Sequence, residues 1–246
     1  MVFISKYHIG TRWRINLIKS QLDLTKKDRV LDAGCGEGYI AHSISKKVKT
    51  VQAVDFSKEV IKFNKSFETA KLKFDYLDLN NLDKKYKKNS FDKIICMDVL
   101  EHAHGFKKIM KNFNLVLKNK GVLLATIPVF DDHGHFEYND FNFLKLFFKE
   151  QGFNIKKMVY MQMPFFTKLI HKFITNLRQV AGMEQKEVDS FDETLSFELR
   201  KKPSLTFRIY QVFFSVIYLF HYFDFKTYRN GEDFILLVLE KEIFNK

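Results

Sequence analysis

The chain has 246 residues, enough for one large domain, and its 46% apolar content suffices for a packed core, which excludes a disordered protein. The formal net charge is +12, and a basic surface attracts phosphate groups. However, most of the 41 basic residues are lysine rather than arginine, which has the better geometry for phosphate and guanine. The charge alone therefore does not favour a nucleic-acid partner.

The cysteine content and the N-terminus point to a reducing compartment. Cys35 and Cys96 are too few for a disulfide framework, and both are expected to be small buried packing residues rather than nucleophiles. Residues 1–6 lack an apolar run followed by a small-residue cleavage site. We therefore expect a cytoplasmic protein, with contact at the inner membrane surface as an additional expectation.

Short apolar runs rich in β-branched residues alternate along the chain with stretches of helical spacing. The expected strands are 29–33, 51–54, 72–77, 91–97, 121–127, 153–163 and 234–239. The expected helices are about 38–47, 57–67, 105–117 and 138–151. Such alternation implies right-handed crossovers and a parallel sheet covered on both faces. We predict an α/β, Rossmann-like doubly wound fold with a mostly parallel seven-stranded sheet and a helical insertion before the last strand.

The first strand leads into a glycine-rich turn. Asp32 ends this strand, Gly34-Cys35-Gly36-Glu37-Gly38 follows, and a helix begins near Tyr39. Glycines allow a tight turn and close approach of a ligand to the backbone, so we expect a nucleotide-type cofactor across it. Asp55 ends the next strand, where its carboxylate can accept hydrogen bonds from both ribose hydroxyls.

The charge of this turn distinguishes between two kinds of cofactor. Gly36-x-Gly38-x-x-Ala41 formally fits the dinucleotide fingerprint, so NAD is an alternative. A pyrophosphate prefers amides and cations at the start of a helix, whereas this loop offers Asp32 and Glu37 and no basic residue. Carboxylates suit a ligand with an ammonium group and a sulfonium. S-adenosylmethionine has both.

Four segments resemble the motifs of class I S-adenosylmethionine-dependent methyltransferases, in the right order and with suitable spacing. They are VLDAGCGEG at 30–38, AVDFS at 53–57, FDKIICMDVLEH at 91–102 and GVLLATIP at 121–128. The resemblance covers about 1–163 and 233–241 and implies that S-adenosylmethionine is the methyl donor.

The resemblance also implies eight cofactor-binding residues. They are Asp32, Gly34, Gly36, Asp55, Phe56, Asp78, Leu79 and Met97. Asp32, Gly34 and Gly36 are expected at the aminoacyl end, Asp55 at the ribose and Asp78 near the adenine amino group. A capping role for a helical turn is the alternative for both Asp78 and Asp55.

Two histidines are candidate general bases. The sulfonium methyl is already electrophilic, so the protein must align an acceptor and, where needed, remove its proton. A neutral imidazole with a pKa near ~6.5 can take that proton. His102 follows the fourth strand and His135 the fifth, at the edge where ligands bind in open α/β sheets. The alternative for His102 is a helix-start residue packed under the sheet.

The segment around His102 leaves a metal ion as an open alternative. Asp98, Glu101 and His102 resemble the acidic-plus-histidine segment of quinone-pathway O-methyltransferases, which implies a divalent ion beside the substrate. No Asn/Asp-Pro-Pro-aromatic sequence follows Met97, which disfavours amino-methylation of a flipped base.

Residues 164–232 break the alternation and read as a helical insertion into a domain formed by 1–163 and 233–246. Apolar residues at helical spacing include Phe166, Leu169, Ile170, Phe173, Ile174 and Leu177. The uncharged run 209–223 is shorter than the ~20 residues that span a bilayer. Two interpretations remain: a lid for a hydrophobic acceptor, with membrane contact through 164–225, or helices that are ordinary core.

We therefore expect S-adenosylmethionine-dependent methyl transfer to the oxygen of a small hydrophobic acceptor, such as a lipid, a quinone precursor or an aromatic metabolite. An RNA or protein methyltransferase that uses the basic surface is the first alternative. A non-catalytic S-adenosylmethionine-binding scaffold is the second. The sequence leaves the oligomeric state open.

Overall fold

A computed structural model describes residues 9–128, 141–161 and 234–243. The chain divides into two compact units, Met1–Trp13 with Gln162–Arg229 and Arg14–Met161 with Asn230–Lys246. The first unit lies almost wholly outside the described residues, whereas the second is described over most of its length. The expected insertion 164–232 and the candidate base His135 also lie outside the described residues and stay predictions.

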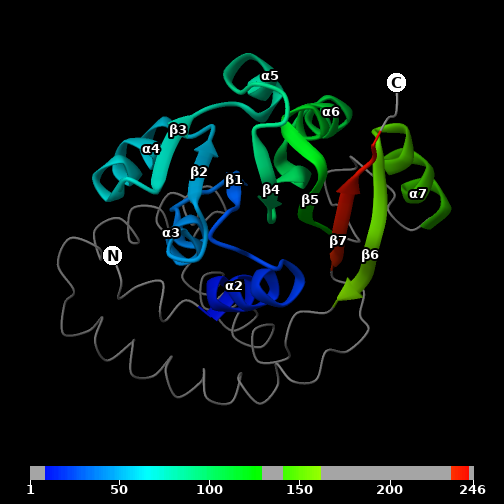
Figure 1. Cartoon of the computed structure of the whole chain (residues 1–246), viewed down its shortest axis with the longest axis horizontal. Helices are drawn as coiled ribbons and strands as arrows, with labels where there is room; N and C mark the ends of the chain where they lie inside the picture. The colour runs from blue at the N-terminus through cyan, green and yellow to red at the C-terminus, as the bar shows by residue number, and fades with distance from the viewer. Residues whose placement is uncertain (1–8, 129–140, 162–233, 244–246) are drawn as a thin grey trace, which may run out of the picture. The chain divides into compact units, whose positions relative to one another are not determined.

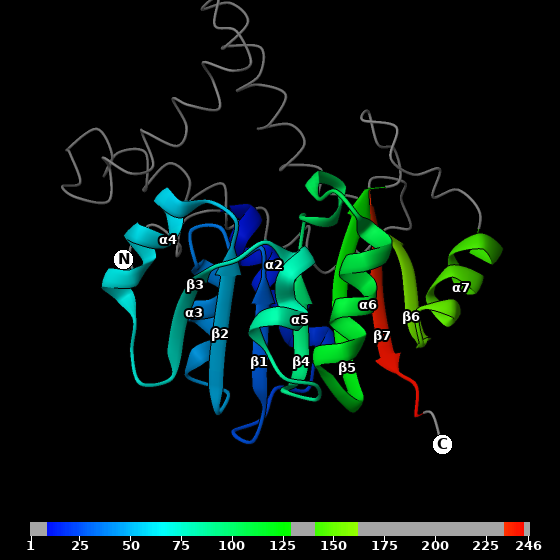
Figure 2. The same ribbon diagram turned by 90° about the horizontal axis from the view of Figure 1, so that it is seen from above.

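Seven strands form one sheet in the order β3-β2-β1-β4-β5-β7-β6. Their bounds are β1 Arg29–Ala33, β2 Thr50–Asp55, β3 Leu72–Tyr76, β4 Phe91–Cys96, β5 Leu117–Pro128, β6 Phe153–Met161 and β7 Phe234–Lys241. The first five strands in this order, β3, β2, β1, β4 and β5, pair in parallel. Strand β7 lies between β5 and β6 and is antiparallel to both (Figure 2). The predicted mostly parallel seven-stranded sheet is confirmed.

Helices cover both faces of this sheet, with α3 on one side and α5 and α6 on the other (Figure 1). The helices are α2 Ile9–Gln21, α3 Tyr39–Ser45, α4 Lys58–Asn64, α5 Leu82–Lys85, α6 Phe106–Val116 and α7 Phe141–Glu150, with short 3-10 turns η1 Lys65–Phe67, η2 Leu79–Asn81 and η3 Leu100–His102. In the described part of the chain, no helix combines the length and apolarity needed to cross a membrane.

The local sequence explains most of these elements. β1 has apolar residues pointing to both faces because both faces of a parallel sheet are covered, and Val30, Leu31 and Ala33 are fully buried. α4 begins at Ser57, whose hydroxyl accepts a hydrogen bond from the Val60 N–H. α2 was not predicted, because Ile15, Leu17 and Ile18 form only a short apolar stripe among polar residues.

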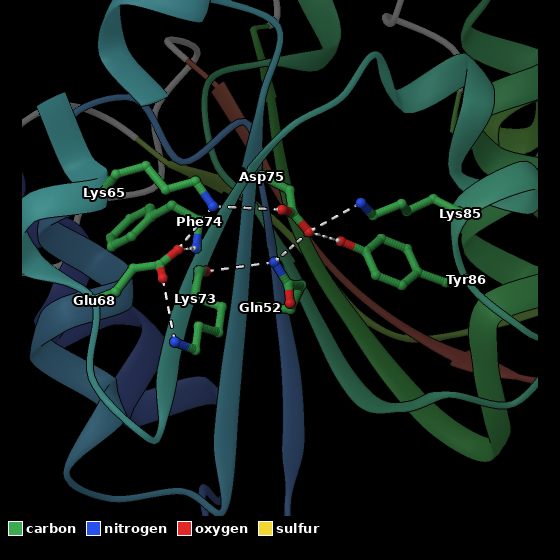
Figure 3. Close-up of polar contacts among 8 residues, drawn as sticks. All are labelled: Gln52, Lys65, Glu68, Lys73, Phe74, Asp75, Lys85 and Tyr86. Carbon is green, nitrogen blue, oxygen red and sulfur yellow. Dashed lines mark hydrogen bonds and ion pairs between the residues drawn. The ribbon is translucent and has the colours of Figure 1, made fainter. Parts of the chain in front are cut away.

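A polar network braces the edge strand β3 against its neighbours (Figure 3). Glu68 accepts the outward-facing N–H of Phe74 at 3.0 Å, and its carboxylate also pairs with Lys65 and Lys73. Asp75, on the same strand, pairs with Lys65 and Lys85. A side chain therefore satisfies one outward-facing N–H of β3, and charged side chains gather along this strand, which disfavours pairing with another strand.

Candidate functional site

The sheet brings the expected cofactor residues from four segments to one edge. β3, β2, β1 and β4 are parallel neighbours, so their carboxyl ends lie side by side. Asp32 lies on β1 and Asp55 ends β2, while Asp78 lies two residues after β3 and Met97 directly follows β4. The edge that they share is the one at which open α/β sheets bind ligands.

The glycine-rich loop after β1 is fastened to β2 by backbone bonds. The N–H groups of Gly34 and Cys35 both donate to the Val54 carbonyl at 2.9 Å. The Gly36 N–H donates to Oδ2 of Asp55 at 2.8 Å. The loop therefore takes one defined conformation beside the carboxylate that is expected to hold the ribose.

The three glycines of this loop have positive φ angles but differ in their surroundings. A Cβ at Gly34 would overlap the Val99 side chain, and one at Gly38 would lie 2.7 Å from the Phe74 ring. At Gly36, with φ of 46°, no atom lies within 4 Å of that position. The loop is therefore open on the Gly36 side, where a ligand can approach the backbone closely.

Two buried carboxylates flank this loop. Asp32 is 2% exposed, and among the described residues its Oδ2 has no hydrogen-bond partner. Burial, with a smaller contribution from the Asp55 carboxylate, raises the pKa of Asp32 to about 7. Asp55 is 9% exposed and also accepts the Ser57 N–H at 2.9 Å. It therefore has a structural role in addition to the one expected toward the ribose.

This arrangement fits a cationic cofactor better than a phosphate. A buried carboxylate with one oxygen left without a hydrogen-bond partner is stabilised when a positive charge is placed beside it. Gly34–Gly38 carries the carboxylate of Glu37 and no lysine or arginine, which disfavours a pyrophosphate. The sulfonium and ammonium groups of S-adenosylmethionine meet the requirement that Asp32 creates.

The segment after β3 is expected to meet the adenine. Oδ1 of Asp78 accepts the Asn80 N–H at 2.8 Å, so the capping role that the sequence left open is present. The Leu79 side chain is buried, and its carbonyl accepts a bond from Asn112 at 2.9 Å. Phe56 is 75% exposed and offers an aromatic surface directly after Asp55.

The segment after β4 contains the candidate base and the residues considered for a metal. His102 is exposed and ends η3. Asp98 has a positive φ of 53° and is held by Thr126, whose hydroxyl accepts the Asp98 N–H and donates to its carboxylate, and by an ion pair with Arg14. Within 9–128, 141–161 and 234–243, no group of three or more metal-ligating side chains gathers. The metal alternative therefore has no support.

Both cysteines are buried, and burial raises their thiol pKa values. They are protonated packing residues, not nucleophiles, at neutral pH.

Several polar residues around the site were not found from the sequence. They are Arg14, Asn64, Asn112 and Thr126. The two asparagines had a usable signal, since Asn64 and Asn112 are polar residues three positions after Ile61 and Ile109 on the apolar faces of their helices. The partners of the others depend on which segments the fold brings together.

Known proteins similar to this chain indicate its family independently of the site geometry. Residues 24–135 match a family model described as a methyltransferase domain. An uncharacterized protein of Methanocaldococcus jannaschii is 31% identical over 161 residues, which cover 64% of this chain and 68% of that protein. A ubiquinone biosynthesis O-methyltransferase of Coxiella burnetii is 33% identical over 119 residues, covering 47% of this chain. The matched region spans only half the length, 50%, of that enzyme.

A solved structure has a similar fold. A putative methyltransferase from Bacillus halodurans has a TM-score of 0.58 at 15% identity, with 93% of this chain and 99% of that chain covered. At this identity the likeness concerns the fold alone. The motifs, the sheet order and the sequence relatives nevertheless agree, and the dinucleotide fingerprint in the glycine loop is incidental. The chain belongs to the class I S-adenosylmethionine-dependent methyltransferases.

Proposed function

We propose that this chain transfers a methyl group from S-adenosylmethionine to the oxygen of a small hydrophobic acceptor, such as a lipid, a quinone precursor or an aromatic metabolite. The observation that carries the cofactor part is the pair of buried carboxylates, Asp32 and Asp55, beside the open face of Gly36. Similarity to the O-methyltransferase of Coxiella burnetii supports oxygen as the methylated atom.

In this proposal each part of the site has a separate task. Asp32 faces the positive end of the cofactor, Asp55 accepts hydrogen bonds from the ribose, and Phe56 packs against the adenine. The cofactor supplies an electrophilic methyl group on a positively charged sulfur. His102 takes the proton of the acceptor hydroxyl as the oxygen forms its bond to the methyl carbon and the carbon–sulfur electrons return to sulfur.

A glycine pair tests where the cofactor lies. Gly36→Ala places a methyl group in open space, so we expect a modest stability loss of ~1–2 kcal/mol for the left-handed backbone but a larger loss of affinity for S-adenosylhomocysteine. Gly38→Ala meets the Phe74 ring and should lower stability more than Gly36→Ala does. Calorimetric titration and thermal unfolding separate the two effects. Unchanged affinity in Gly36→Ala would place the cofactor elsewhere.

Formation of S-adenosylhomocysteine tests the reaction. The protein is incubated with S-adenosylmethionine and catechol, phenol or prenylated quinol acceptors, with RNA and a protein mixture as separate arms. We expect turnover with a hydroxylated apolar acceptor. Turnover only with RNA, falling steeply as salt is added, would favour the RNA alternative. Cofactor binding without product in any arm would favour the scaffold.

The predicted lid and membrane contact concern residues 164–232 and 164–225 and rest on the sequence pattern alone. Flotation with anionic and neutral vesicles tests the membrane part, because a basic amphipathic helix binds anionic lipid more strongly. Equal recovery with and without vesicles would contradict it.

A further inference from the structure

A fully buried asparagine forms a hydrogen bond to the backbone of the glycine loop. Asn64, the last residue of α4, is 0% exposed, and its Nδ2 donates to the Gly36 carbonyl at 2.8 Å. The Gly36 N–H donates to Asp55 on the other side. The N–H and the carbonyl of Gly36, the loop glycine with open space beside it, are therefore both held by hydrogen bonds.

The bond also orients the next peptide. In a trans peptide the carbonyl and the following N–H point in opposite directions, so fixing the Gly36 carbonyl fixes the direction of the Glu37 N–H. A left-handed glycine is conformationally free by itself, and without such bonds the loop would sample other conformations. Asn64 and Asp55 together keep it in one.

Helix packing alone does not explain an asparagine at this position. Asn64 shares its helix face with the buried Ile61, where an apolar residue would pack without loss of hydration. Among the described residues, Oδ1 of Asn64 is buried without a hydrogen-bond partner, which is a further destabilising feature. What the residue contributes in return is its bond to Gly36.

A buried asparagine also bonds to the backbone of the segment after β3, which contains Asp78 and Leu79. Asn112, on the buried face of α6, is 6% exposed and donates from Nδ2 to the Leu79 carbonyl at 2.9 Å. Asn64 and Asn112 are the buried asparagines of the described chain. Each of them donates to the carbonyl of a residue assigned to the cofactor, although they come from different helices.

We propose that Asn64 and Asn112 are positioning residues that hold the Gly36 and Leu79 loops in the conformation that binds the cofactor. They do not touch the cofactor and act through the backbone of the two loops. The inference rests on the proposed placement of S-adenosylmethionine across Gly36. It predicts that replacing either asparagine lowers cofactor affinity by more than the accompanying loss of folding stability would explain.

The test compares three asparagines that make the same kind of bond. Asn114 donates from Nδ2 to the Gly152 carbonyl at 2.8 Å, and Gly152 is also left-handed, with φ of 77°. Gly152 precedes β6, an edge strand that is separated in the sheet from β1 and its glycine loop by β4, β5 and β7. Asn114→Ala therefore removes an equivalent bond far from the cofactor and is the matched control.

We expect Asn64→Ala and Asn112→Ala to weaken binding of S-adenosylhomocysteine by about three- to tenfold, the range for loss of one hydrogen bond. Asn114→Ala should stay within about twofold of the unmodified protein. Asn64→Leu removes the same donor while filling rather than emptying the site, so its affinity should fall as in Asn64→Ala, whatever its melting temperature. The KM for S-adenosylmethionine should rise by more than kcat falls.

Hydrogen exchange of the free protein gives a readout without ligand. Amides of residues 34–38 should exchange faster in Asn64→Ala than in Asn114→Ala. If affinity falls equally in all three alanine variants, or only in proportion to melting temperature, the asparagines are merely structural and the inference is overturned. Asp55→Ala separates this outcome from failure of the proposed function, because unchanged affinity in that variant would show that the cofactor does not lie at this loop.

Discussion

Binding of the cofactor is expected to release protons from Asp32 near neutral pH. In the free protein burial raises the pKa of this carboxyl from 3.8 to about 7, and the neighbouring Asp55 adds to the effect. Asp32 is therefore about half protonated at pH 7. A sulfonium beside the carboxylate favours its ionised form. A fall of the Asp32 pKa below about 5 would release roughly 0.5 proton per cofactor bound.

Calorimetric titration at pH 7 in buffers of different ionisation enthalpy measures this number directly. The amino group of the ligand takes up a small fraction of a proton if it binds as ammonium, and it does so in the unmodified protein and in Asp32→Asn alike. The unmodified protein should therefore show a net release of protons. Asp32→Asn should show the small uptake alone. The same proton count for the two proteins would refute the charge assigned to Asp32.

The raised pKa also predicts how the stability of the free protein depends on pH. The folded state holds the Asp32 proton up to about pH 7, whereas the unfolded chain loses it near 3.8. Stability therefore falls as pH rises between these values, because the folded state binds more protons. Asp32→Asn should melt at a higher temperature than the unmodified protein at pH 8 but not at pH 4. A uniform shift at both pH values would contradict this reasoning.

Three further predictions concern other parts of the structure. Thr126→Val removes the hydroxyl that satisfies both the N–H and the carboxylate of Asp98, and with Thr126 only 1% exposed it should lower the free energy of unfolding by ~1–3 kcal/mol in urea denaturation. Equal stability of the two proteins would show that Asp98 is held otherwise. Burial alone would raise the pKa of Glu68, but hydrogen bonds from the Phe74 N–H and two lysines outweigh burial and lower this pKa to about 2. Glu68→Gln should therefore destabilise the protein above pH 4.5, and the difference in stability between the two proteins should narrow as pH falls toward 2. A difference that does not change with pH would refute the ionic role. His102→Ala should reduce turnover by about 10² while cofactor affinity is retained, as measured by product formation and calorimetry. A change of less than about threefold would return this exposed histidine to a structural role.

The amino-acid pattern by itself determined the parts of this protein that depend on neighbouring residues. The apolar residues of β1 and the glycines of 34–38 are neighbours in sequence, and their spacing indicated the turn, while Asp32 and Glu37 indicated its preference for a cation. The left-handed angles of these glycines explain why the signal is local, since only glycine adopts them without strain.

Tertiary structure decided what depends on distant segments. The run 234–239 was predicted as a strand, but its antiparallel place between β5 and β6 follows from pairing across a long stretch of chain. The ion pair that joins Asp98 to Arg14, and the bond from Asn64 to Gly36, likewise connect residues whose pairing has no local signature. A short-range pattern records the burial of a side chain but not its partner, because hydrogen bonds and ion pairs form only after the helices and strands have packed.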